Sequence, residues 1–335
     1  MGPSSAQLLE LLRSAAGADL ESRNAVQERV DDILRPTQAM TRLDEVAVWI
    51  AGWQRTSQPA VASPTALIFA ADHGVTAEGV SAYPPEVTGA MLAAFEASRA
   101  SVSALAAVAG ATVRAIDVGV GDPTGNLRTE PALSSKRFAD ALATGRSAVA
   151  DLDTDLLIVG EMGIGNSTAA AAVSGAILGG DPSLFVGRGT GVDDAGLAAK
   201  AAVVTDALAR ISNVTDPLEI LRHVGGAELV AMTGAIAEAR LRSIPVLLDG
   251  YIATSPALVL HTIDPSFVDN CWAGHQSAEA GHQVVLDHLG RTPLLTLDMR
   301  LGEASGAMAA VPLVKMACAL VTDVPTFAEW FGPDA

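Results

Sequence analysis

The stretch DLLIVGEMGIGNST, residues 155–168, decides how the chain folds. Its first half is an unbroken apolar run of strand length, which is typical of a strand buried on both faces of a parallel sheet. A glycine-rich turn follows, and the chain then continues into an alanine-rich segment with the composition of a helix. Such a strand-turn-helix unit predicts a parallel α/β fold if it recurs along the chain.

The unit does recur. Further apolar strands followed by helical segments are predicted at residues 65–74, 112–122, 183–194, 244–254 and 293–303. Their alternation predicts an α/β fold with a doubly wound, mostly parallel sheet flanked by helices. Open sheets of this kind bind ligands at the carboxyl ends of their strands. The acids expected at those ends are Asp72, Glu161, Asp249 and Glu303.

The two ends of the chain have a different pattern from its middle. The chain has 335 residues, enough for one large α/β domain or two smaller ones. Residues 1–55 are helical in pattern, and the helices from about 304 onward are expected to pack back on them. We therefore expect an α/β catalytic domain over 61–303 and a small helical domain made of 1–60 and 304–335.

Composition limits the classes of partner. The net charge is −17 and no basic cluster is present, which excludes binding to a nucleic-acid backbone and requires any phosphate to be held locally. Cys271 and Cys318 are too few for a disulfide framework and indicate buried, reduced thiols. The first residues form an amphipathic helix rather than a signal peptide, and residues 162–180 a buried helix rather than a membrane span. These features predict a soluble, cytoplasmic protein with no membrane partner.

The segment LDMRLGEASGAMAA, residues 297–310, places a single carboxylate, Glu303, before an apolar helix. A lone acid at the end of a strand fits a general base in a proton-transfer step. The alternative is an ordinary first-turn glutamate stabilised by the helix dipole. The segment by itself favours that alternative, whereas the rest of the chain favours the general base.

Two glycine-rich turns are candidate anion sites. GEMGIGNST, residues 160–168, lets a ligand approach the backbone and exposes N–H groups, although it lacks the lysine of a P-loop and the order of a dinucleotide site. An acid beside such a turn, Glu161, favours contact with a ribose hydroxyl. In VGRGTGVDDAGLAAK, residues 186–200, the paired aspartates are expected to cap the next helix rather than bind a metal. Lys200 is either a surface lysine or an anion contact, the latter only if the helix starts late.

The histidines are expected to be structural. His73 is predicted to be hydrogen-bonded within its strand-end loop rather than to act as an acid or base. GHQSAEAGH, residues 274–282, only faintly suggests a metal, since no H-E-x-x-H pattern is present, and Ser277 is better read as a phosphate donor. No nucleophile elbow, catalytic Cys–His signature or kinase motif occurs. We expect neither a metal nor a cofactor.

Several of these stretches, in this order between residues 70 and 310, resemble the nicotinate-nucleotide:dimethylbenzimidazole phosphoribosyltransferase family. The matching stretches are ADHGVTAEGVSAYPPEVT, GEMGIGNSTAAAA, VGRGTGVDDAGLAAK, GGAELVAMTGAI, PVLLDGYIATSPALV, HQSAEAGH and MRLGEASGA. The resemblance implies transfer of the 5-phosphoribosyl group from nicotinate mononucleotide to a nitrogen of a benzimidazole-type base, in cobalamin biosynthesis. The products would be α-ribazole 5'-phosphate and nicotinate. It also implies a parallel-sheet domain with a small helical domain, and a homodimer.

The resemblance further implies roles for individual residues. Glu303, in the motif R-L-G-E, would be the general base that takes the azole proton. The phosphate and ribose would contact Glu161, Gly163, Gly165, Asn166, Gly189, Lys200 and Ser277. The base pocket would include Tyr83, Met162 and Leu301.

The chain departs from the family pattern in places. RPTQAMTRLDE, residues 35–45, lacks the lysine and both glycines of the family's N-terminal signature, and residues 117–133 form a shorter connection. Pro85 stands where many members have glutamine. Two alternatives therefore stay open: a paralogue that uses the same donor with another acceptor, or a weakly active member that serves as a binding partner. The sequence alone does not fix the acceptor or the oligomeric state.

Overall fold

A five-stranded parallel sheet lies at the centre of the computed structural model, which describes residues 5–189 and 191–332. The strand order is β2-β1-β3-β4-β5, so the chain leaves β1 on one side and then returns to build the other side. The strands are β1 (Pro64–Ala70), β2 (Thr112–Asp117), β3 (Leu156–Met162), β4 (Val246–Leu248) and β5 (Cys271–Ala273). The predicted doubly wound, mostly parallel fold is confirmed.

The sheet forms because its apolar runs bury both faces. Successive side chains of a strand point to opposite faces, so each central strand feeds two separate cores. One core takes Leu67, Phe69, Leu157, Val159, Val246 and Leu248. The other takes Ala66, Ile68, Leu156, Ile158 and Leu247. All residues of β1 are buried, as expected for a strand covered on both faces.

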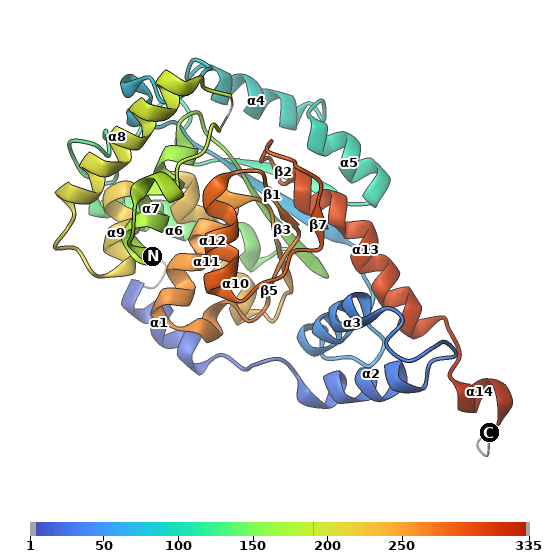
Figure 1. The fold of residues 1–335 in the computed structure, drawn as a ribbon. Helices are drawn as coiled ribbons and strands as arrows, with labels where there is room; N and C mark the ends of the chain where they lie inside the picture. Colours follow the sequence, from blue (N-terminus) through green and yellow to red (C-terminus); the bar gives the residue numbers. More distant parts are fainter. Residues whose placement is uncertain (1–4, 190, 333–335) are drawn as a thin grey trace.

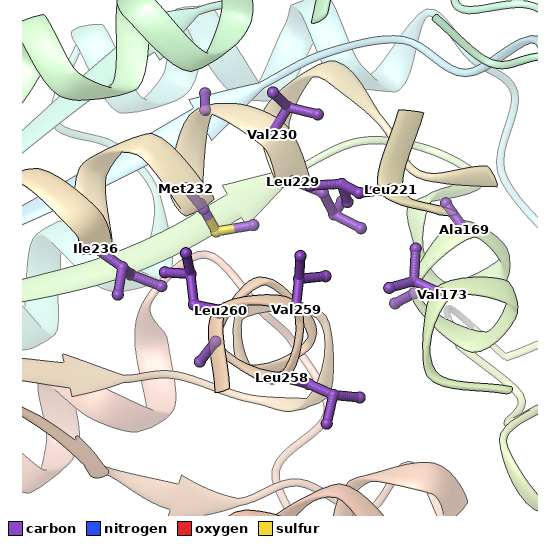
Figure 2. Packing of buried hydrophobic residues seen from close by; sticks show 14 of the residues in the cluster. Ala169, Val173, Leu221, Leu229, Val230, Met232, Ile236, Leu258, Val259 and Leu260 are labelled. Atoms are coloured by element: carbon purple, nitrogen blue, oxygen red, sulfur yellow. The ribbon is translucent and has the colours of Figure 1, made fainter. Parts of the chain in front are cut away.

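Helices cover both faces of the sheet (Figure 1). They are α1 (Ser5–Ser14), α2 (Leu20–Asp32), α3 (Thr41–Gln54), α4 (Val87–Glu96), α5 (Ser101–Ala109), α6 (Ser135–Ala150), α7 (Asn166–Leu178), α8 (Asp194–Arg210), α9 (Pro217–Val224), α10 (Ala227–Leu241), α11 (Tyr251–Ile263), α12 (Ala280–Leu289), α13 (Ser305–Thr322) and α14 (Phe327–Phe331). Figure 2 shows how tightly the first core is filled: Met232 and Ile236 of α10 face Leu260 of α11.

The N-terminal helices are divided between the two cores. Helices α2, α3 and α13 share the second core, and Arg29 of α2 forms an ion pair with Glu329 of α14 at 2.8 Å. In contrast, α1 packs against α10, and its Leu8 and Leu12 belong to the first core. The helices after residue 304 thus return to α2 and α3 but not to α1. The division into a domain at 61–303 and one from both termini stays a prediction.

Two predicted strands differ from the structure. No strand occurs in the described residues 183–189 and 191–194, where a 3-10 turn (Pro182–Leu184) precedes residues without regular structure and α8 begins at Asp194. Gly189 and Gly191 have left-handed backbone angles, which are incompatible with a strand. In residues 293–303, only β7 (Leu295–Thr296) is extended, and it pairs with β6 (His275–Gln276) outside the main sheet. Strand β5, at the edge of the sheet, was not predicted.

Apolar helices and the two cysteines bear on the remaining sequence predictions. Within the described residues, Val87–Ala109 and Ser305–Thr322 are long and apolar enough to cross a membrane by composition. The first is interrupted between α4 and α5, and the second is α13, whose inner face lies in the second core. Residues 162–180 were expected to be a buried helix after a glycine-rich turn; the helix is α7, which spans Asn166–Leu178 and in which Asn166 and residues 168–175 are buried. Cys271 and Cys318 are free and buried, as predicted.

Candidate active site

A pocket opens at the carboxyl ends of β3 and β4, where an open α/β sheet is expected to bind its ligand. Its walls come from the turn between β3 and α7, the start of α11, residues 275–279 and residues 300–302. Most of the predicted substrate-binding and base-pocket residues line it: Glu161, Met162, Gly163, Asn166, Gly189, Ser277 and Leu301. Residues that the sequence placed far apart are therefore brought together.

Glu161 lies at the end of β3 and is 5% exposed. Its carboxylate accepts a hydrogen bond from the side-chain amide of Asn166, the first residue of α7. Burial, and next the charge of Asp249, raise the pKa of Glu161 well above its ordinary value. Glu161 thus offers a buried carboxyl group at the pocket wall, suited to a sugar hydroxyl.

Glu303 does not line the pocket itself but follows Gly302, which does. Its backbone N–H donates to the carbonyl oxygen of Glu161 at 3.2 Å, which joins the two acidic segments. The side chain is 5% exposed, and its Oε2 has no hydrogen-bond partner in the described part of the chain. Burial, helped by the charge of Asp249, raises the pKa of Glu303 to about 7. A buried carboxyl with that pKa is suited to general base catalysis near neutral pH.

The turn that carries Glu303 is strained. We call residues 302–307 the Glu303 turn. Glu303 and Ala304 have φ angles of 60° and 62°, and each such non-glycine residue costs about 1 kcal/mol or more. Gly160 permits this turn to lie against β3, since a side chain at Gly160 would collide with Ala304. The structure thus corrects the prediction that Glu303 ends a strand: it stands in a left-handed turn directly before α13.

Asp249 follows β4 and lies beneath the Glu303 turn. It is 1% exposed, and its Oδ1 accepts the backbone N–H of Ala307 at 2.8 Å. Burial raises its pKa to about 7, while hydrogen bonds from the backbone of Ala307, Gly250 and other turn residues oppose that rise. The sequence identified Asp249 as a strand-end acid but gave it no role in the site.

Lys200 is not among the lining residues, but its amine lies behind two of them, Ser167 and Gly189. It lies within α8, not near its start, yet it is 1% exposed. Its Nζ donates to Oγ of Ser167 at 2.8 Å and to the carbonyl oxygen of Gly187 at 3.0 Å. Burial lowers the pKa of Lys200 to about 8, so it remains largely cationic at neutral pH. The alternative of a surface lysine is wrong: Lys200 is buried beside the first turn of α7.

The loop at 187–189 separates Lys200 from the pocket, which Gly189 lines. Gly189 has a φ of 52°, and a methyl group there would lie 3.1 Å from Nζ of Lys200. The N–H of Gly189 donates to Oε1 of Glu279 at 3.0 Å. Exposed N–H groups and a cation at a helix start are features of anion sites. As predicted, Asp193 caps α8 by accepting the N–H of Gly196 at 2.8 Å.

Ser277 lies across the pocket, is buried, and its Oγ has no partner in the described residues. Its N–H donates to Nδ1 of His282 at 2.8 Å, and Nε2 of His282 lies 3.1 Å from Oγ1 of Thr254. Both nitrogens of His282 are therefore occupied, which gives this residue a supporting role. The hydroxyl of Ser277 is free to donate to a ligand.

Three predictions near the pocket need separate statements. Gly165 begins α7 with a φ of 97° and lies behind the pocket against His73 and Thr76. Tyr83 is 53% exposed in the loop before α4 and is not among the lining residues, so its contact with a base stays a prediction. His73 is hydrogen-bonded, but not within its own loop: its Nε2 lies 2.8 Å from Oε1 of Glu228 in α10.

Sequence analysis also missed lining residues. Tyr251, His275, Glu279 and Arg300 all border the pocket. Tyr251 lies two residues after the strand-end Asp249, and Arg300 is the first residue of the R-L-G-E motif that contains Glu303. Their positions next to residues already singled out were the available signal.

Comparison with known proteins agrees with this geometry. A family described as a phosphoribosyltransferase matches residues 15–330. Nicotinate-nucleotide–dimethylbenzimidazole phosphoribosyltransferases from a Ruegeria and a Jannaschia species are each 46% identical, over 95% of this chain and 94% of the relative. The crystal structure of CobT from Thermus thermophilus is 40% identical with a TM-score of 0.89, covering 92% of this chain and 98% of that one.

These matches extend over nearly the whole chain and confirm the resemblance drawn from the motifs. They also confirm the enzyme class, a phosphoribosyltransferase that acts on small molecules. The chain belongs to the nicotinate-nucleotide–dimethylbenzimidazole phosphoribosyltransferase family.

Proposed function

We propose that this enzyme transfers the 5-phosphoribosyl group of nicotinate mononucleotide to a nitrogen of dimethylbenzimidazole, as a step of cobalamin biosynthesis. The products are α-ribazole 5'-phosphate and nicotinate. The observation that carries the proposal is the buried Glu303 carboxyl beside the pocket, with its pKa raised to about 7, in a chain 46% identical to relatives that bear this name.

The chemistry suits this arrangement. Nicotinate leaves as a pyridine from a pyridinium, so its departure needs no strong acid. The incoming azole is a weak nucleophile until its N–H proton is removed, and Glu303 is the group that removes it. The ribose carbon with developing positive charge then needs an aligned nucleophile, and positioning by the pocket supplies much of the rate.

The two ends of the donor are assigned to the two sides of the pocket. The phosphate binds Lys200, Ser277 and the backbone N–H groups of Gly163 and Gly165, and the ribose hydroxyls bind Glu161. The N–H groups of Ile164 and Asn166 already donate to Oγ1 of Thr88 and to the carbonyl oxygen of Gly163. Burial of Lys200 and the unpartnered hydroxyl of Ser277 support this orientation. The acceptor base lies on Met162 and Leu301, which line the pocket, with Tyr83 moving in from its exposed loop.

The direct test is to incubate the purified enzyme with nicotinate mononucleotide and dimethylbenzimidazole and to follow both products by chromatography. Nicotinate and α-ribazole 5'-phosphate should appear in equal amounts. Absence of both products would contradict the proposal. A panel with a purine and a phenol as acceptors decides between dimethylbenzimidazole and the alternative of another acceptor.

We also propose that the enzyme is a cytoplasmic homodimer. The segment Val87–Ala109 supports an interface, because only 22% of its most apolar window is buried and Val108 is 85% exposed. The free thiols of Cys271 and Cys318 fit a reducing compartment. Light scattering should give twice the monomer mass, and Val108→Lys should reduce it; a monomer at micromolar concentration would contradict the dimer.

A further inference from the structure

We propose that Asp249 is the positioning residue for Glu303: it holds the Glu303 turn by binding the amino-terminal N–H groups of α13, and its charge tunes when Glu303 is able to accept a proton. The inference rests on the function proposed above. It concerns a residue outside the pocket lining, which touches no substrate directly.

The geometry is that of a helix cap supplied from another strand. Helix α13 begins at Ser305 and has no side-chain cap of its own, since its N-cap is Ala304. The first N–H groups of a helix need an acceptor, and the carboxylate of Asp249 provides it through Ala307 at 2.8 Å. Because Asp249 directly follows β4, the start of α13 is tied to the most rigid part of the molecule.

This hydrogen bond matters because the backbone conformation of the Glu303 turn is not stable without contacts from the rest of the protein. Glu303 and Ala304 both have left-handed backbone angles without being glycine, a conformation that persists only when the surroundings impose it. Besides Asp249, the hydrogen bond from the N–H of Glu303 to the carbonyl oxygen of Glu161 constrains the turn. Loss of the Asp249 carboxylate would let the turn relax and move the carboxylate of Glu303 away from the pocket.

The second effect is electrostatic. Glu161 on β3 and His275 on β6 are ionisable groups close to Glu303 or Asp249, and Glu228 on α10 acts on Glu161. Arg300, three residues before Glu303, lines the pocket. Nε2 of His275 lies 3.5 Å from Oδ1 of Asp249, and burial lowers the pKa of that histidine, so it adds little positive charge. An ionised Asp249 therefore makes the proton of Glu303 harder to remove.

The test uses two substitutions that separate these effects. Asp249→Asn keeps an acceptor oxygen for the Ala307 N–H but removes the charge. The acid limb of the kcat profile should then move to lower pH by about one unit, with a plateau within tenfold of the wild type. Asp249→Ala removes both the acceptor oxygen and the charge. Its kcat should fall by roughly 10- to 100-fold, while KM for nicotinate mononucleotide changes little.

A measurement without turnover keeps the inference separate from the proposed function. Hydrogen exchange of a peptide covering 303–309 should be faster in Asp249→Ala than in the wild type and unchanged in Asp249→Asn. Glu238→Gln is the matched control, since it removes a carboxylate that pairs with Arg146 outside the pocket. It should change neither the pH profile of kcat nor the hydrogen exchange of the 303–309 peptide.

The outcomes are distinct. If the wild type forms no nicotinate, the proposed function fails, and exchange still decides whether Asp249 holds the turn. Equal exchange in Asp249→Ala and the wild type would overturn the positioning role. An acid limb that stays in place or moves to higher pH in Asp249→Asn would overturn the electrostatic role.

Discussion

Ionisable groups lie on two sides of the pocket. Glu161 lines one side, the acidic side, with Glu303 and Asp249 buried behind the lining. On the other side, the Lys200 side, Lys200 is buried behind Ser167 and Gly189, with Glu279 nearby. Burial acts on both, but in opposite directions: it raises the pKa of Glu303 to about 7 and lowers the pKa of Lys200 to about 8. Burial thus brings the pKa values of both the proposed base and the cation close to neutral pH.

The comparison explains how a protein with a net charge of −17 holds an anionic donor. Long-range attraction is unfavourable, so binding depends on contacts within the pocket. On the Lys200 side the amine is largely charged at pH 7. On the acidic side the raised pKa values leave the carboxyls only partly ionised, which reduces their repulsion of the phosphate.

The largest effect is expected on the acidic side. Glu303→Gln removes the general base but keeps the size of the side chain, so turnover should fall by roughly two to four orders of magnitude. The wild-type rate should also fall as the pH drops through about 7, because the raised pKa leaves Glu303 protonated there. Steady-state kinetics from pH 5.5 to 9 measure both, and binding of the donor should persist. Near-normal turnover in the variant would remove Glu303 from the mechanism.

A smaller effect is expected on the Lys200 side. Lys200→Ala should weaken binding of nicotinate mononucleotide by about 1.5–3 kcal/mol, the scale of a charge-assisted hydrogen bond. Binding of dimethylbenzimidazole, which carries no phosphate, should barely change. Calorimetric titration with each ligand separately measures the two effects. An equal loss for both ligands would mean that Lys200 supports the fold rather than the phosphate.

The charge of Lys200 predicts a pH dependence in the basic range. Since its pKa is lowered to about 8, the amine loses its charge as the pH rises through that value, and donor affinity should fall between pH 7 and 9. The donor phosphate ionises near pH 6 and keeps its charge across this range. The fall should be absent in Lys200→Ala. A wild-type affinity that stays constant to pH 9 would contradict this prediction, because it would mean that the free lysine keeps its proton to that pH or that its charge does not contribute to donor binding.

No effect at all is expected from removal of divalent cations. The motifs contain no acidic pair or His/Cys cluster with ligand spacing, and Asp193 is occupied by its bond to Gly196. Turnover should be the same after dialysis against EDTA. Activity that is lost in EDTA and restored by magnesium would contradict this expectation and would show that a divalent cation takes part in the reaction.

Parts of the site were predictable because they depend on local pattern. The strand ending at Glu161, the glycine-rich turn after it and the alanine-rich α7 all follow from residues close in sequence. The loop at 186–193 was not predictable in the same way. Its apolar residues suggest a strand, but Gly189 adopts a left-handed angle and packs against Lys200, while its N–H donates to Glu279.

By itself, the sequence determined the parallel α/β fold, the family and the identity of the acidic residue proposed as base, because apolar periodicity and short motifs are local properties. Tertiary structure alone decided that Lys200 is buried, that Glu303 stands in a strained turn and that Asp249 lies beneath it. These depend on β3, β4, α8 and α13 meeting at one end of the sheet. The burial that shifts the pKa values of the site arises only when these elements pack together.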